Sequence, residues 1–158
     1  MDVPLIEQVK IQAQVLVPLV KALQAELGEE RANAIVRKAL GDLYRKFGEE
    51  WRRKQGARDL GERMASTFDV FAAGDALDYE VVKQAPDAFE VNVTGCRYAK
   101  FYNEMDAAEL GFLLVCSSDF PMAEGFGTEV QLTRTQTIMQ GASHCDFRYM
   151  LKKRNDTR

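Results

Sequence analysis

The spacing of apolar residues changes after Gly74, and this change constrains the fold more than any other feature of the chain. Before Gly74, apolar residues recur at steps of three or four, which is typical of amphipathic helices. After it, residues 89–93 alternate strictly between apolar and polar side chains, as in a strand with one buried face. The pattern predicts an α+β fold in which N-terminal helices pack on an antiparallel sheet.

The N-terminal half is expected to form three helices. The first spans residues 5–27, and Pro18 should kink or divide it because proline cannot donate a backbone hydrogen bond. The second carries an apolar stripe over residues 36–51 and ends near Gly56. The third covers residues 58–73.

The second half is expected to supply a sheet of about four antiparallel strands with inserted short helices. Residues 79–93 have the pattern of a β-hairpin. Helical spacing returns between residues 96 and about 120 and indicates two short helices. A second strand pair is predicted over residues 130–139 and 145–151.

Length and composition are those of an ordinary globular protein. The 158 residues, 46% hydrophobic and 28% charged, fit one domain over residues 1–158, with a helical half (1–74) and a half bearing the sheet and the site (75–158). The net charge of −3 is spread along the chain, so no positive field favours nucleic acid. The sequence has no apolar run near 20 residues and no signal peptide, so we expect no membrane association and a cytoplasmic location.

Arg134 is the best candidate to bind an anionic group. On a strand, it would share one face with apolar Val130, Leu132 and Ile138 and with Gln136. If that face points inward, Arg134 lies at the edge of a cavity, where its planar guanidinium suits a substrate carboxylate. The alternative is a structural ion pair with one of the acidic residues.

Cys116 and Asp119 form a second candidate pair. They are three residues apart in an expected helix, so their side chains should lie on one face. A thiolate can attack an electron-poor carbon, and a carboxylate can orient water or transfer protons. The alternative is that Cys116 is a small buried hydrophobe and Asp119 a turn residue.

Cys145, His144 and Cys96 complete the set. Cys145 starts the last strand on the expected core face, while His144, the single histidine, faces the other way and reaches the same site only if the turn bends. Cys96 ends a strand and could point toward Cys116, so a metal held by Cys96, Cys116 and Cys145 is one alternative. The chain lacks a Cys-x-x-Cys unit and a phosphate-binding glycine loop, which favours a site without metal or cofactor.

Four segments of the C-terminal part resemble the L-2-amino-thiazoline-4-carboxylic acid hydrolase family. They are Cys96-Arg-Tyr-Ala, the run from Glu109-Leu-Gly through Cys116 and Asp119, Leu132-Thr-Arg-Thr-Gln-Thr-Ile-Met, and Gly141 followed by Cys145-Asp-Phe-Arg-Tyr. This part of the chain also looks like the small-molecule-binding four-vinyl-reductase type of domain. The resemblance adds Thr137 to the site, although simple strand alternation puts Thr137 and Arg134 on opposite faces unless the strand is bulged.

The resemblance implies a hydrolase that opens a small cyclic C=N or C–S compound bearing a carboxylate, such as L-2-amino-thiazoline-4-carboxylate. Cys116, Asp119 and Cys145 would be catalytic, and Arg134, Thr137, Cys96 and His144 would bind the substrate. The competing hypothesis is a non-enzymatic sensor or carrier that binds a small molecule or a metal. The broad apolar stripes of the helices also suit a homo-oligomer, although covering the sheet requires them too.

Overall fold

The computed structural model describes residues 2–153 and confirms the α+β architecture, with helices first and a four-stranded antiparallel sheet after them. The α-helices are α1 (Leu5–Leu27), α2 (Glu29–Gln55), α3 (Leu60–Ala72), α4 (Arg97–Glu104), α5 (Ala108–Leu114) and α6 (Asp119–Gly125). The 3₁₀ turns are η1 (Cys116–Ser118) and η2 (Ile138–Gln140), and the strands are β1 (Leu77–Ala85), β2 (Ala88–Cys96), β3 (Val130–Thr133) and β4 (Cys145–Leu151). Within residues 2–153 no helix is long and apolar enough to cross a bilayer.

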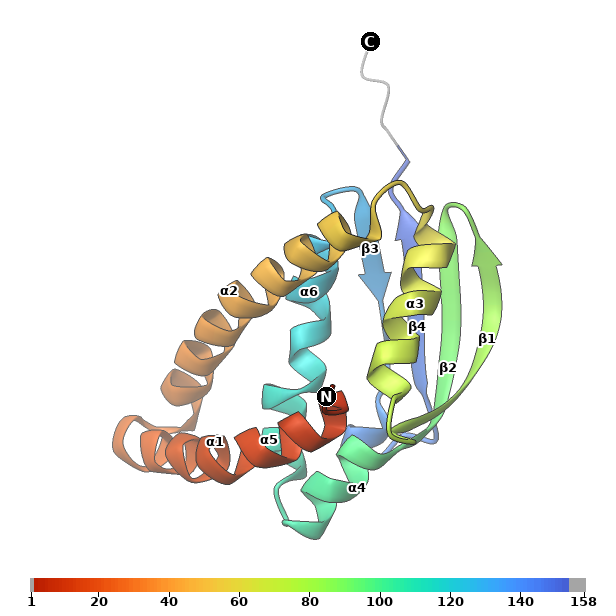
Figure 1. Ribbon diagram of the computed structural model, residues 1–158. Coiled ribbons are helices and arrows are strands. Elements are labelled where there is room, and N and C mark those ends of the chain that lie inside the picture. The colour runs from red at the N-terminus through yellow and green to blue at the C-terminus, as the bar shows by residue number, and fades with distance from the viewer. Residues whose placement is uncertain (1, 154–158) are drawn as a thin grey trace.

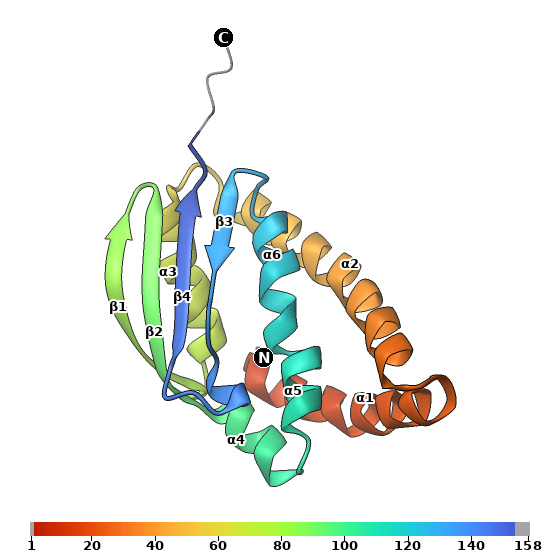
Figure 2. The same ribbon diagram turned by 180° about the vertical axis from the view of Figure 1, so that it is seen from behind.

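The sheet has the strand order β1-β2-β4-β3, and every neighbouring pair is antiparallel. Alternate residues on the central strands are buried, so the alternation seen in the sequence does place one face inward. Helix α3 lies across this face and buries Leu60, Met64 and Phe68 against it (Figure 1). No helix within residues 2–153 lies in front of the opposite face (Figure 2).

Helices α1, α2, α4 and α5 form a second layer with a core of its own, whereas Ala123 of α6 is buried in the cluster under the sheet. The buried residues of the second layer come mainly from α1, α4 and α5. Helices α1 and α2 diverge from the turn at Gly28, and α5 and α6 lie between the two arms (Figures 1 and 2). The molecule therefore contains two hydrophobic clusters, one under the sheet and one among the helices.

The prediction that Pro18 divides the first helix is wrong, because α1 runs unbroken from Leu5 to Leu27. Proline deprives the carbonyl of Gln14, four residues earlier, of its helical donor. Both Pro18 and Gln14 are exposed, so water can replace the lost hydrogen bond.

The predicted strand over residues 130–139 is also too long, because β3 ends at Thr133. The backbone amides of Thr135 and Gln136 donate to the Asp146 carboxylate at 2.8 and 3.0 Å. These amides thus bond to the Asp146 side chain and not to the backbone of a neighbouring strand. The chain leaves the sheet at Arg134. Strand alternation consequently gives no information beyond Thr133.

Helices α2 and α6 cross in backbone contact at two glycines. A Cβ atom added at Gly48 would overlap the carbonyl oxygen of Met122, and one added at Gly125 would overlap the carbonyl oxygen of Arg45. Only glycine permits this approach. The crossing holds α2 against the short helices that carry the site.

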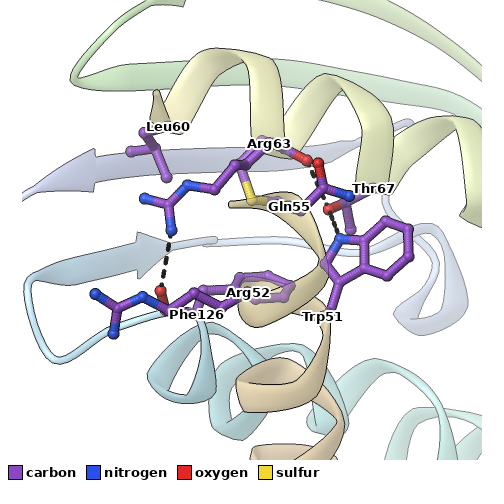
Figure 3. A pocket seen from close by; sticks show the side chains of 8 residues that line it. Trp51, Arg52, Gln55, Leu60, Arg63, Thr67 and Phe126 are labelled. Carbon is purple, nitrogen blue, oxygen red and sulfur yellow. Dashed lines mark hydrogen bonds between the residues drawn. The ribbon is translucent and has the colours of Figure 1, made fainter. Parts of the chain in front are cut away.

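Polar contacts fix α3 to the C-terminal ends of α2 and α6. The Trp51 indole N–H donates to Thr67 at 2.7 Å, and an Arg63 guanidinium nitrogen donates to the carbonyl oxygen of Phe126 at 3.3 Å (Figure 3). The cavity among these side chains has a volume of about 10 Å³, enough for a water molecule but for no larger ligand. This region is a structural joint between the two layers.

We expect Gly48→Ala to lower the free energy of unfolding by about 1–3 kcal/mol, because the added methyl forces α2 and α6 apart. Gly41→Ala is the matched control on the same helix, where the nearest atoms to an added Cβ lie at 3.9 Å. Denaturant unfolding followed by the fluorescence of Trp51, the single tryptophan, measures both variants. Equal stability of the two variants would contradict the close crossing.

Candidate functional site

A cavity of about 260 Å³ lies where the two hydrophobic clusters meet. Its wall combines residues from α1, α2, α3, the sheet and the segment around η1. Most of the wall is apolar, and its aromatic members are Tyr44, Phe47, Phe68, Phe71, Tyr98 and Phe147. The polar residues that concern the site are Ser118, Asp119, Arg134 and Thr137 together with three cysteines.

Arg134 and Asp119 form a buried ion pair on this wall. The Nη1 atom of Arg134 donates to Oδ2 of Asp119 at 2.6 Å and to the carbonyl oxygen of Cys116 at 3.0 Å. Only 3% of the Arg134 side chain is exposed. Its guanidinium carbon also lies 5.0 to 6.0 Å from the ring centres of Phe112, Phe120 and Phe147, within the range of cation–π attraction.

The sequence left two roles open for Arg134, a structural ion pair and contact with a ligand. The structural ion pair is present. Within residues 2–153, Nη1 is the only atom of the Arg134 guanidinium that donates a hydrogen bond. The Nε and Nη2 atoms have no such partner, although the side chain lines the cavity. Arg134 can therefore pair with Asp119 and still donate hydrogen bonds to a ligand.

Asp119 has an unusual protonation equilibrium for an aspartate. Burial raises its pKa to about 6, although the positive charge of Arg134 acts in the opposite direction. A carboxyl group that titrates near neutral pH can both accept and donate a proton at physiological pH. Asp119 is thus the cavity residue best suited to proton transfer.

The three cysteines line the same cavity as free thiols. Burial raises the pKa of Cys145 to about 11, and it raises the pKa of Cys96 and Cys116 as well. The Cys145 sulfur accepts a hydrogen bond from the Ile138 amide at 3.2 Å, and the Cys96 sulfur accepts one from the Ala99 amide at 3.4 Å. All three are protonated at neutral pH and lack the low pKa of an activated nucleophile.

Metal binding by Cys96, Cys116 and Cys145 stays a prediction. The three thiols face one cavity. Within residues 2–153, however, no group of three or more histidine, cysteine, aspartate or glutamate side chains is arranged to hold a metal ion.

Thr137 lies on the cavity wall together with Arg134, in spite of strand alternation. Because β3 ends at Thr133, residues 134–137 do not alternate between two faces of a strand, and both side chains can reach the cavity. The Thr137 hydroxyl donates to Oε1 of Gln140 at 3.0 Å and accepts from the Gln140 amide at 3.2 Å. Its hydrogen bonds are used within the protein, so it shapes the cavity more than it offers a free donor.

His144 is the predicted site residue that the structure does not bring to the cavity, since it is absent from the wall. Its ring contacts the Ser143 hydroxyl at 2.8 Å and the Gln136 side-chain amide at 3.3 Å. The neighbouring Cys145 points inward, and adjacent residues on a strand face opposite sides. The substrate-binding role expected for His144 therefore has no support in this geometry.

Sequence reasoning missed the helical contribution to the wall. Tyr44 and Phe47 of α2 and Leu5, Gln8 and Val9 of α1 line the cavity. In the sequence these residues belong to apolar stripes that look like ordinary core. A stripe that faces a cavity has the same spacing as one that faces packed side chains, so no sequence signal separates the two.

The raised pKa of Asp119 predicts that its ionisation destabilises the fold. Its pKa is about 6 in the folded protein, against 3.8 as the ordinary value. Protonation of Asp119 therefore stabilises the folded state, and this contribution is complete below about pH 4. As the pH rises through 6 the contribution is lost, and the free energy of unfolding falls by up to about 3 kcal/mol. We expect Asp119→Asn to remove this part of the pH dependence. Urea unfolding of both proteins between pH 4 and 7 measures the difference, and parallel curves would contradict the assignment.

Comparisons with known proteins extend these observations. The family model described as L-2-amino-thiazoline-4-carboxylic acid hydrolase matches residues 8–149. No curated protein matches the chain. One similar solved structure is the crystal structure of the phenol-responsive sensory domain of the transcription activator PoxR with phenol, which has a TM-score of 0.56 and 11% sequence identity. That match covers 87% of this chain and 73% of the other, and at this identity it shows a shared fold.

The family match includes the helices that form the outer wall of the cavity as well as the C-terminal segments. It therefore extends well beyond the four motifs that suggested the resemblance. The chain belongs to the L-2-amino-thiazoline-4-carboxylic acid hydrolase family.

Proposed function

We propose that this protein binds a small cyclic or aromatic molecule in the interior cavity, with an acceptor oxygen of the ligand on Arg134. The observation that carries the proposal is the aromatic wall with one buried guanidinium on it. Binding sites for small molecules are mostly apolar pockets with a few placed polar groups. A dry cavity of about 150 Å³ accepts benzene, so 260 Å³ suits a compound of one ring with substituents.

The charge balance of the site favours a neutral ligand oxygen. Asp119 already neutralises Arg134, so the polar end of the cavity carries no net charge while both are ionised. A hydroxyl or carbonyl oxygen can accept from Nε or Nη2 without bringing a second negative charge into a buried site. The carboxylate ligand expected from the sequence would have to share the guanidinium with Asp119.

Two further features support a binding role. The thiols are protonated, which suits contact with an apolar ring better than nucleophilic attack. The similar fold in the PoxR sensory domain was crystallised with phenol, a single ring with one hydroxyl. The fold is thus compatible with a ligand of the size and polarity that we propose.

Hydrolysis at the same site is the second candidate, favoured by the family description and by the pKa of Asp119. Asp119 would take a proton from water while the water oxygen bonds to the ring carbon between nitrogen and sulfur. The ring bond to the leaving atom would then break, and that atom would receive the proton from Asp119. This version needs no thiolate, unlike the covalent mechanism through Cys116 or Cys145.

Binding is tested by calorimetry with phenol, toluene and benzoate, three single rings that differ in their polar group. We expect phenol to bind at least about tenfold more tightly than toluene, because it adds a charge-assisted hydrogen bond to Arg134. Cys116→Met should abolish binding by filling the cavity, while Ser117→Met, at a neighbouring position outside the wall, should retain it. Failure of all three compounds at millimolar concentration would sink the proposal, and preferred binding of benzoate would favour a carboxylate ligand.

Catalysis is tested by the disappearance of L-2-amino-thiazoline-4-carboxylate in the presence of the purified protein. The water mechanism predicts turnover that falls at least about 100-fold in Asp119→Asn and persists in Cys116→Ala and Cys145→Ala. Loss of turnover in either cysteine variant would instead indicate a covalent thiol adduct. Phenol binding without turnover would leave the binding role and exclude this hydrolase activity.

A further inference from the structure

The outward side of α1 carries large apolar side chains where a surface helix normally carries charges. Residues 11–20 contain no charged side chain. Ile11, Val15 and Leu19 are 64%, 67% and 52% exposed, while the opposite side of α1 is buried in the helical core. They are spaced four residues apart and form one stripe along the helix. A helix that is apolar on both sides is normally covered on both sides.

Helix α2 continues this surface. Leu43 and Phe47 are one helical turn apart and 43% and 47% exposed. Phe47 also lines the cavity together with Gln8 and Gln12 of α1, so both helices border the same opening. Figure 1 shows the two helices as diverging arms on one side of the molecule. We call Ile11, Val15, Leu19, Leu43 and Phe47 the α1–α2 face.

The size of the α1–α2 face suits a protein interface. With full residue areas of about 150–200 Å², the exposed fractions amount to roughly 500 Å² of mostly apolar surface. A stable interface buries about 800 Å² on each partner, with polar residues around an apolar centre. The α1–α2 face could thus form the apolar centre of the surface that each copy buries.

We propose that the α1–α2 face is a homodimer interface in which α1 packs antiparallel on α1 of a second copy. Ile11 and Leu19 lie at equal distances along the chain from Val15, so a two-fold axis at Val15 brings Ile11 of one copy against Leu19 of the other. The stripe is self-complementary because no charge lies within it, and the nearest charged residue, Lys10, is paired with Glu7 at 3.2 Å. This proposal does not depend on the ligand or reaction assigned to the cavity.

The competing place for self-association is the edge strand β1, where Val81 and Val82 are 46% and 52% exposed. Two register shifts interrupt the pairing of β1, and Glu80 and Lys83 flank the two valines. Bulges and charges on an edge strand oppose pairing with another chain. The helical face has neither obstacle.

Sedimentation velocity over a range of protein concentrations tests the interface with two matched variants of exposed valines. We expect a dimer for wild type and for Val82→Glu, and a monomer with at least about 100-fold weaker association for Val15→Glu. Circular dichroism checks that each variant is folded. A wild-type monomer at 200 µM, roughly the upper end of practical concentrations, or a dimer lost in Val82→Glu and kept in Val15→Glu, would overturn the proposal.

Engineered thiols test the antiparallel geometry and need no destabilising charge. Under oxidation, Val15→Cys should form a covalent dimer with itself, because the two-fold axis places the two sulfurs together. Ile11→Cys and Leu19→Cys should cross-link when mixed and much less when alone, and wild type controls for the interior thiols. Self-linking of Ile11→Cys without a link through Val15→Cys would contradict this arrangement.

Discussion

The ion pair between Arg134 and Asp119 is the constraint on which the arrangement of the site depends. A guanidinium placed among aromatic rings, with only 3% of its side chain exposed, loses its hydration and must have a charged partner close by. Asp119 is that partner, and the carbonyl oxygen of Cys116 accepts a second hydrogen bond from Arg134. The contact joins the segment after β3 to η1 and to the start of α6, so it fixes the short helices relative to the sheet.

The cavity exists because two layers with separate cores meet without filling the space between them. At about 24 cal/mol per Å³, a dry and enclosed cavity of 260 Å³ costs on the order of 6 kcal/mol, and an open mouth lowers this cost. Larger side chains at Cys96, Cys116 or Cys145 would fill the space. A sequence that keeps three small thiols beside six aromatic rings gives up stability for the cavity, which favours a role for it in function.

The sequence was sufficient for the layers and for the polar end of the site, and insufficient where side chains determine the path of the backbone. Apolar spacing predicted α2 and the β1–β2 hairpin because both patterns continue over many residues. The end of β3 depends on Asp146, eleven residues after Thr135, and no local pattern contains that contact. For the same reason Thr137 lies beside Arg134 although alternation separates them, and His144 lies outside the cavity although Cys145 lies within it.

Binding and hydrolysis would use the same residues, and the electrostatics of the ion pair between Arg134 and Asp119 favours one of them over the other. While Asp119 is ionised, it neutralises Arg134, and the polar end of the cavity suits a neutral oxygen. For Asp119 to act as a base on a carboxylate substrate, the guanidinium must hold two carboxylates at once, one on Nη1 and one on Nε and Nη2. Burial already raises the pKa of Asp119, and a second anion nearby would raise it further and remove the base. The physical cost of the carboxylate reaction is therefore higher than that of binding a neutral ring, and a fold can keep its cavity while its chemistry changes.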